Sequence, residues 1–223
     1  IFVPDQKNHE WGCFDYSQQE PRLVVHYAAL QDLPGANIFV DAYNKDKKAK
    51  TAWDANNVQG ESPEEKIERL DPKPKDTDFH KIVADIADIP RDQAKTINLG
   101  KFYGMGKNKL KAELGVNDKK AQEIIDDYET KVPFVKQLTL QVSRRAQDRG
   151  RIRTLLGRLC RFPLWEPSYY GIHKPLKHEE ALAEHGPGIK HAYTYKALNK
   201  LIQGSAADMT KKAMIDLHKE GII

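Results

Sequence analysis

The sequence predicts an α+β protein in which helices outnumber strands. Long stretches between residues 78 and 221 repeat apolar side chains at helical spacing, whereas residues 1–15 and 151–165 favour strands. The chain has 223 residues, of which 39% are hydrophobic and 30% charged, enough to form a core in one large domain or two small ones. No apolar run approaches the roughly 20 residues that cross a bilayer, so we expect a soluble, cytoplasmic protein without a membrane partner.

The N-terminal part is expected to place a carboxylate at a strand end. Residues 1–15 read as a short strand that ends at Asp15, and residues 20–30 read as a helix with Pro21 in its first turn. Residues 44–77 are polar, charged and rich in proline, which predicts an exposed insertion. Within it, only the turn capped by Ser62 is expected to be ordered.

The middle of the chain predicts a series of helices divided by stop signals. Five helices are expected, at residues 79–89, 91–103, 107–115, 118–132 and 133–149. An arginine-rich hairpin that turns at Gly157 follows, then a loop over residues 166–188 and a last helix from residue 191 to Gly221.

The helix at 91–103 has a stripe of functional side chains. Arg91, Lys95, Leu99 and Tyr103 are four residues apart, so on a helix they lie along one side. Two cations can hold a polyphosphate and the aromatic ring can stack on a base, which predicts a nucleotide site. The alternative is that the cations form a solvated face and that Leu99 and Tyr103 belong to the core.

The charge distribution permits a nucleic-acid partner. The net charge is only +4, but one strip between residues 144 and 161 is strongly basic, with Asp148 as its single acid and with Lys136 nearby. The strip contains Arg144, Arg145, Arg149, Arg151, Arg153, Arg158 and Arg161. It predicts phosphate binding, with a solvated helix face as the alternative. Cys13 and Cys160 lack metal-ligand spacing and are interpreted as reduced structural residues.

Three segments, in this order, resemble the family A DNA polymerases, the class of bacterial DNA polymerase I and of many phage replicases. Residues 15–22, DYSQQEPR, are similar to the first palm motif, and residues 91–104 follow the pattern R-x3-K-x3-L-x3-Y-G of the fingers helix. Residues 203–208, QGSAAD, are similar to a later palm helix, and Asp78-Phe79-His80 matches the D-x-H that precedes the fingers helix. Because the matches cover nearly the whole chain, coincidence is a poor explanation.

The resemblance implies DNA-templated DNA synthesis by two-metal phosphoryl transfer. It also implies that primer–template DNA and deoxynucleoside triphosphates are the partners. It implies Mg²⁺ bound by the Asp15 carboxylate and the Tyr16 carbonyl, with Asp15 and Lys95 as catalytic residues. The resemblance assigns the triphosphate to His80, Arg91 and Lys95.

Further positions are assigned by the same resemblance. Glu20 matches the steric gate that excludes ribonucleotides, Leu99 lies where the sugar is contacted, and Tyr103 matches the ring near the templating base. Asn199 and Gln203 match residues that contact the minor groove at the primer terminus, where acceptors are shared by all base pairs.

Departures from the family pattern matter too. Leu99 stands where Phe or Tyr is usual, and Tyr195 stands where Arg is common. The third palm motif, a His-Asp-Glu, is expected after the last helix and does not occur by Ile223. We therefore expect an incomplete palm, residues 1–77 and 163–223, with a mostly helical fingers region at residues 78–162.

This interpretation carries expectations about activity. The fragment is expected to be inactive alone, with a second polypeptide supplying the missing motif, and a phage-like origin would place it in the host cytoplasm. One alternative is a non-catalytic nucleic-acid-binding piece of a split polymerase, and another is an assembly protein that retains only the fold.

Overall fold

A computed structural model describes residues 15–55, 77–103, 105, 107–169 and 171–221. It has the expected α+β character, with many helices and two small sheets. The helices are α1 (Gln19–Ala29), α2 (Ala36–Ala55), α4 (Phe79–Ala87), α5 (Arg91–Phe102), α6 (Lys107–Leu114), α7 (Asp118–Lys131), α8 (Pro133–Arg149), α9 (His178–His185) and α10 (Ala197–Lys219). None of the helices in the described ranges is long and apolar enough to span a membrane.

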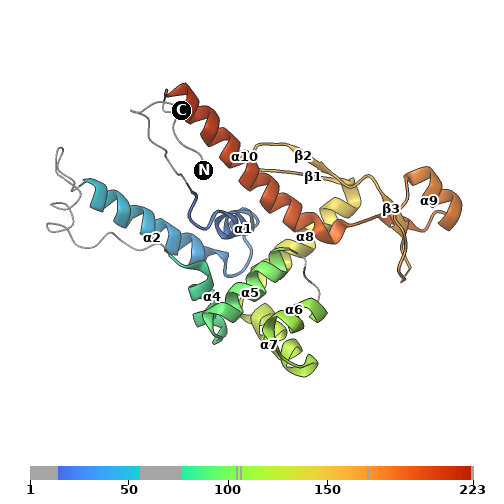
Figure 1. Ribbon diagram of the computed structural model, residues 1–223, viewed down its shortest axis with the longest axis horizontal. Coiled ribbons are helices and arrows are strands. Elements are labelled where there is room, and N and C mark those ends of the chain that lie inside the picture. Colours follow the sequence, from blue (N-terminus) through green and yellow to red (C-terminus); the bar gives the residue numbers. More distant parts are fainter. Residues whose placement is uncertain (1–14, 56–76, 104, 106, 170, 222–223) are drawn as a thin grey trace, which may run out of the picture.

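Two antiparallel strand pairs complete the fold. Strand β1 (Arg151–Arg153) pairs with β2 (Leu159–Arg161), and β3 (Trp165–Pro167) pairs with β4 (Ile189–His191). The β1–β2 hairpin lies beside α10, and β3 and α9 project beyond the N-terminal end of that helix (Figure 1). Helices α4 to α7 form a group on the other side of α8.

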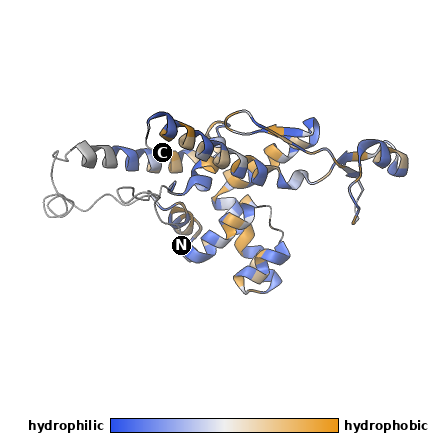
Figure 2. Cartoon of the chain, turned by 45° about the horizontal axis from the view of Figure 1, so that its top comes forward, coloured by the Kyte–Doolittle hydropathy of each residue, from blue (hydrophilic) through white to orange (hydrophobic). Residues whose placement is uncertain are grey.

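The core is built around aromatic side chains from four helices. Phe39 of α2 packs on Phe79 of α4, with ring centroids 4.8 Å apart, and on Phe134 of α8 at 5.3 Å. Phe79 also lies 5.9 Å from Phe102 of α5, and all four rings are buried. Apolar residues gather where the central helices cross (Figure 2). This cluster therefore fixes α4 and α5, which have the D-x-H motif and the stripe, against the rest of the protein.

Local capping signals explain several helix ends. The side chain of Asn117 accepts a hydrogen bond from the Lys120 amide at the start of α7. Gly150 ends α8 with a positive φ of 60°, a conformation that costs glycine little. The predicted helices at 20–30, 79–89, 91–103, 107–115, 118–132 and 133–149 are confirmed, with ends within a few residues, and so is the hairpin.

Three expectations need correction, and two others concern residues outside the described ranges. Residues 44–55 belong to α2 rather than to an irregular insertion, because their alanines and lysines favour a helix despite their polarity. Residues 166–188 contain most of β3 and all of α9 rather than only loop, and the last helix begins at Ala197 after a 3₁₀ turn, Thr194–Lys196. The strand before Asp15 and the Ser62 turn lie outside the described residues.

Candidate active site

Helix α5 presents the predicted stripe to solvent. Arg91, Lys95 and Tyr103 are exposed and Leu99 is half-buried, and the opposite side of the helix is buried through Ala94, Ile97, Asn98, Gly100 and Phe102. The stripe is therefore not part of the core, apart from the partial burial of Leu99. Two exposed cations on a helix that is fixed from behind can reach an anionic ligand without a rearrangement of the fold.

Asp78 joins the start of α4 to the start of α5. Its Oδ1 atom accepts hydrogen bonds from the backbone amides of His80 and Lys81 at 2.9 and 3.2 Å, and its Oδ2 atom pairs with Arg91 Nε at 2.6 Å. Burial acts to raise the pKa of Asp78, but the hydrogen bonds from Arg91 and from the two amides outweigh it and lower the pKa. The charged carboxylate thus caps one helix and orients Arg91 on the next.

His80 is buried beside this pair and held by a polar chain. Its Nδ1 atom lies 3.0 Å from Asn98 Nδ2, and Asn98 Oδ1 accepts a hydrogen bond from Tyr128. Burial lowers the pKa of the imidazole, and the charges of Arg91 and Lys95 lower it further against the opposing effect of Asp78. The neutral ring is therefore favoured. Its Nδ1 atom is hydrogen-bonded to Asn98, and its Nε2 atom has no hydrogen-bond partner among the residues that the structure describes.

Sequence reasoning missed Asn98 and Tyr128. Both are buried, and burial raises the pKa of Tyr128, which keeps its hydroxyl protonated as a donor. A signal for Asn98 was available, because an amide stands among apolar residues on the buried side of a helix and must find hydrogen bonds there. Tyr128 had no such signal, since tyrosine is common at half-buried positions.

Three elements converge on the Tyr103 hydroxyl. Tyr103 donates a 2.5 Å hydrogen bond to Glu20 Oε2 in the first turn of α1. Burial, the hydrogen bond to Glu20 and the charge of Glu20 raise the pKa of Tyr103 to about 12, whereas the side chain of Gln203 on α10 acts to lower it. The structure thus brings together three predicted site residues from α1, α5 and α10. Asn199 is half-buried one turn before Gln203 on the same face of α10.

The QGSAAD segment also anchors α10. Ser205 is fully buried, its hydroxyl lies 2.7 Å from the Tyr27 hydroxyl, and it accepts a hydrogen bond from the Leu155 amide at 3.0 Å. A Cβ on Gly204 would lie 2.7 Å from Thr154 Cγ2, so only glycine allows the hairpin to approach this closely. Gln19 of α1 donates to the Ala206 carbonyl at 3.1 Å. These contacts hold Gln203 in place beside α1.

Asp208 links the same helix to the hairpin. Its Oδ1 atom pairs with Arg158 Nε at 2.9 Å, and Arg158 Nη2 also donates to the Gly204 carbonyl at 2.7 Å. Burial acts to raise the pKa of Asp208, but hydrogen bonds from Thr154, Arg158 and the Leu156 amide lower it. Because Arg158 is held by these contacts, it is not one of the arginines of the strip that we expect to bind phosphate.

Asp15 and Tyr16 are among the residues that line a groove of about 940 Å³. Asp15, Tyr16 and Gln19 line one side, and Met209, Ala213 and Asp216 of α10 are among the residues that line the other. Asp15 is exposed and forms no ion pair with another described residue. A free carboxylate next to a backbone carbonyl is a partial donor set of the kind that Mg²⁺ shares with substrate phosphates. Over the described ranges, no cluster of three or more acidic, histidine or cysteine side chains could hold a metal.

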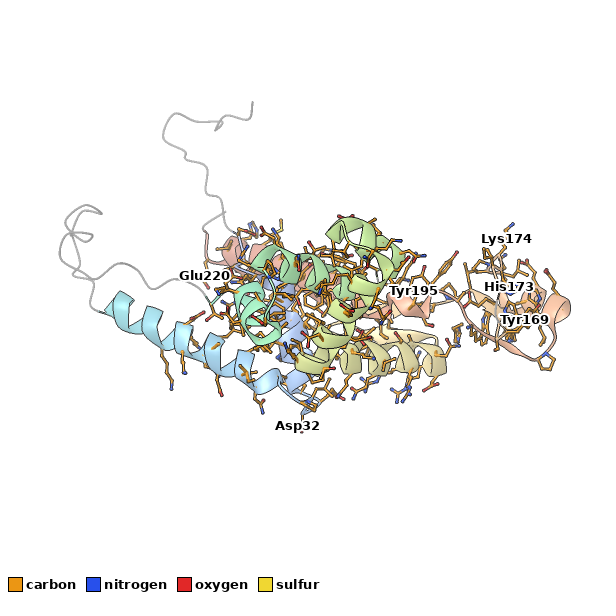
Figure 3. The ribbon with its side chains drawn as sticks, turned by 90° about the horizontal axis from the view of Figure 1, so that it is seen from below. Asp32, Tyr169, His173, Lys174, Tyr195 and Glu220 are labelled. Carbon is orange, nitrogen blue, oxygen red and sulfur yellow. The ribbon has the colours of Figure 1, made fainter. Side chains whose placement is uncertain are left out.

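The remaining site predictions stay predictions. Asp15 and Lys95 are not joined by any hydrogen bond or ion pair between described residues, so the structure does not bring the two predicted catalytic residues into contact. Tyr195, which stands where the family commonly has Arg, is exposed at the N-terminal end of α10 (Figure 3). Lys196 lies over the rings of Tyr193 and Tyr195, at 5.0 and 5.5 Å from their centroids.

Comparison with known proteins identifies the family. The family model for DNA polymerase family A matches residues 75–221. The chain is 33% identical to a DNA-directed DNA polymerase of Pseudomonas phage M6 over 100% of this chain and 32% of that protein. It is 30% identical to DNA polymerase I of Geobacillus stearothermophilus over 97% of this chain and 20% of that protein.

A solved structure shares the fold. The polymerase domain of Pol1 from M. smegmatis, in complex with DNA primer-template and dNTP, superposes with a TM-score of 0.56 at 24% identity, over 92% of this chain and 29% of that chain. The chain thus spans about a third or less of the length of these relatives. The family match covers well over half of the chain and includes the D-x-H, the fingers helix and the QGSAAD segment. The chain belongs to DNA polymerase family A.

Proposed function

We propose that this chain supplies the nucleotide-binding and primer-terminus-binding parts of a DNA-templated DNA polymerase. The observation that supports this most directly is the meeting of Glu20, Tyr103 and Gln203, which joins the assigned sugar gate, the base-contacting ring and the minor-groove reader. The relatives named above are DNA polymerases, and the Pol1 neighbour was solved with primer-template and dNTP. The proposed substrates are therefore primer–template DNA and deoxynucleoside triphosphates.

In the proposed mechanism, α5 receives the triphosphate. Lys95 and Arg91 bind phosphate oxygens as charged donors, with Arg91 oriented by Asp78. Because His80 Nδ1 accepts from the Asn98 amide nitrogen, the proton lies on Nε2, and His80 donates from that atom. Asp15 and the Tyr16 carbonyl would hold Mg²⁺, which would neutralise phosphate charge and activate the primer 3′-hydroxyl. Because Asp15 is one carboxylate, a further acidic ligand from outside the described residues is part of the proposal.

Substrate selection is assigned to two further contacts. Glu20 is half-buried and held by Tyr103, so its carboxylate can exclude a 2′-hydroxyl from the sugar position. Gln203 and Asn199 donate from their amides to minor-groove acceptors at the primer terminus. We also propose a palm of residues 1–77 and 163–223, a fingers region of residues 78–162, and action in the cytoplasm of a phage-infected host.

Primer extension tests the proposal. Residues 1–223 alone are expected to bind primer–template DNA without extending it, and a polypeptide that supplies a His-Asp-Glu segment is expected to restore synthesis. In the restored enzyme, Asp15→Asn should abolish extension while leaving DNA affinity unchanged, and Asp32→Asn, an exposed acid between α1 and α2, serves as the matched control. Extension by the Asp15→Asn variant at the wild-type rate would contradict the assignment. DNA binding without restored synthesis would favour a non-catalytic binding piece.

A further inference from the structure

Two arginines face each other across the β1–β2 hairpin. Arg151 and Arg161 are directly opposite in the antiparallel register, as are Ile152 and Cys160. The Phe162 amide donates to the Gly150 carbonyl at 2.8 Å, so the backbone hydrogen bonds flank the Arg151–Arg161 pair and do not lie within it. In an antiparallel ladder, such a non-hydrogen-bonded pair has the closest Cα atoms, about 4.5 Å apart, and the closest side chains.

Both guanidinium groups lie on the outer face of the hairpin. Ile152 is buried and Cys160 half-buried, so the alternate residues face the core, whereas Arg151 and Arg161 are exposed. Within the basic strip, Arg158 forms an ion pair with Asp208. Asp148, the single acid of the strip, forms no ion pair with Arg151 or Arg161 in the described part of the chain. Like charges directly opposite each other destabilise a strand pair. Arg151 and Arg161 thus form a like-charge pair at a close cross-strand position, and no acidic side chain among the described residues forms an ion pair with either.

We infer that Arg151 and Arg161 form a clamp for a single backbone phosphate of bound DNA. An anion between the two groups would replace their repulsion by two charge-assisted contacts, and guanidinium groups match phosphate oxygens in a bidentate way. Exposed Arg149 and Arg153 lie two residues from Arg151 along the chain and would add to the local positive field. The hairpin packs on α10 through Gly204 and Asp208, so the clamp is rigidly tied to the helix that presents Gln203. This inference rests on the proposed DNA binding.

The salt dependence of DNA binding tests whether Arg151 and Arg161 contact the same phosphate. Dissociation constants for primer–template DNA are measured over a range of salt concentrations for Arg151→Gln, Arg161→Gln and the double variant. Each phosphate contact contributes about 0.9 to the slope of log K against log salt concentration. With a shared phosphate, each single variant weakens binding several-fold with little change in slope, and the double variant lowers the slope by about 0.9. Two separate contacts would lower it by about 1.8, which would overturn the clamp.

Thermal stability provides a second readout. In the free protein at low salt, Arg161→Gln should keep or raise the melting temperature, because it removes a like-charge pair. If the two arginines instead stabilised the hairpin, Arg161→Gln would lower the melting temperature. Lys119→Gln, which removes an exposed charge from α7, is the matched control for both measurements.

The outcomes separate this inference from the proposed function. If the wild-type chain binds no primer–template DNA, both are overturned. If the wild type binds DNA and the double variant binds equally well at every salt concentration, the clamp alone is overturned. Affinity for deoxynucleoside triphosphate should be the same in all variants, and a loss of nucleotide affinity without a loss of DNA affinity would assign the pair to the triphosphate instead.

Discussion

The hydroxyl of Tyr103 donates a hydrogen bond to the Glu20 carboxylate, so the C-terminal end of α5 is joined to the first turn of α1. The two residues are 83 positions apart in sequence. The bond fixes the direction of Glu20, since a carboxylate on the surface of a helix otherwise samples several rotamers. If Glu20 is the sugar gate, as proposed above, sugar selection depends on this contact with the end of α5.

We expect Tyr103→Phe to weaken discrimination against ribonucleotides. The variant keeps the ring and removes the hydrogen bond that holds Glu20. The ratio of ribonucleotide to deoxynucleotide affinity should therefore rise by about tenfold, which corresponds to the lower limit of about 1.5 kcal/mol for a bond to a charged acceptor. The measurement is a competition between the two nucleotides in the enzyme bound to primer–template DNA. Tyr169→Phe, at an exposed tyrosine in the segment before α9, is the control. An unchanged ratio would show that Tyr103 does not orient the gate.

The same hydrogen bond should be visible in a pH titration. The folded-state pKa of Tyr103 is raised from 10.0 to about 12, chiefly by burial and by Glu20. Its contribution to stability is therefore fully present below pH 10 and is lost as the pH rises towards 12. The phenolate absorbance of wild type minus that of Tyr103→Phe should show ionisation near pH 12, and a midpoint near 10.0 would contradict the contact.

Lys95→Ala should reduce nucleotide affinity with little effect on DNA affinity. A charge-assisted contact to phosphate contributes about 1.5–3 kcal/mol, which corresponds to roughly 10- to 150-fold in affinity. Nucleotide and primer–template dissociation constants are measured for this variant and for Lys109→Ala, an exposed lysine on α6. Equal losses for both ligands would place Lys95 outside the triphosphate site.

Stability should fall with decreasing pH because of His80. Burial lowers the folded-state pKa of His80 below the ordinary value of 6.5, so below that pH the unfolded chain binds more protons than the folded chain. The contribution of neutral His80 to the free energy of unfolding is fully present above pH 6.5 and is lost as the pH falls towards the lowered pKa. Denaturant unfolding between pH 7 and 5 should therefore show a smaller pH dependence for His80→Gln than for wild type. His26→Gln, at an exposed position on α1, should behave like wild type.

Gly204→Ala should destabilise the protein although alanine favours a helix. The new Cβ would lie 2.7 Å from Thr154 Cγ2, and separating α10 from the hairpin costs about 1–3 kcal/mol. At Gly188, a Cβ would have no atom within 4 Å, so Gly188→Ala is the control. The free energy of unfolding is measured for both, and a gain in stability for Gly204→Ala would contradict the close packing.

The ends of several helices could be predicted because their signals are local. Asp78 and Asn117 cap with their own side chains, and Gly150 adopts the positive φ that ends α8, so a few neighbouring residues suffice in each case. The stripe of α5 was also predictable, since helical spacing alone places Arg91 and Lys95 on one side. The motifs that mark the family are likewise short stretches of sequence.

Only the tertiary structure decided which polar groups are partners. Ser205 and Tyr27 are 178 residues apart, and Arg158 and Asp208 are 50 apart, so neither pair follows from spacing. Seven arginines look equivalent in the sequence, yet the packing of the hairpin on α10 pairs Arg158 and the strand register sets Arg151 opposite Arg161. The physical reason is that secondary structure depends on neighbouring residues, whereas the cost of burying a charge or a hydroxyl is met by whichever elements the fold brings together.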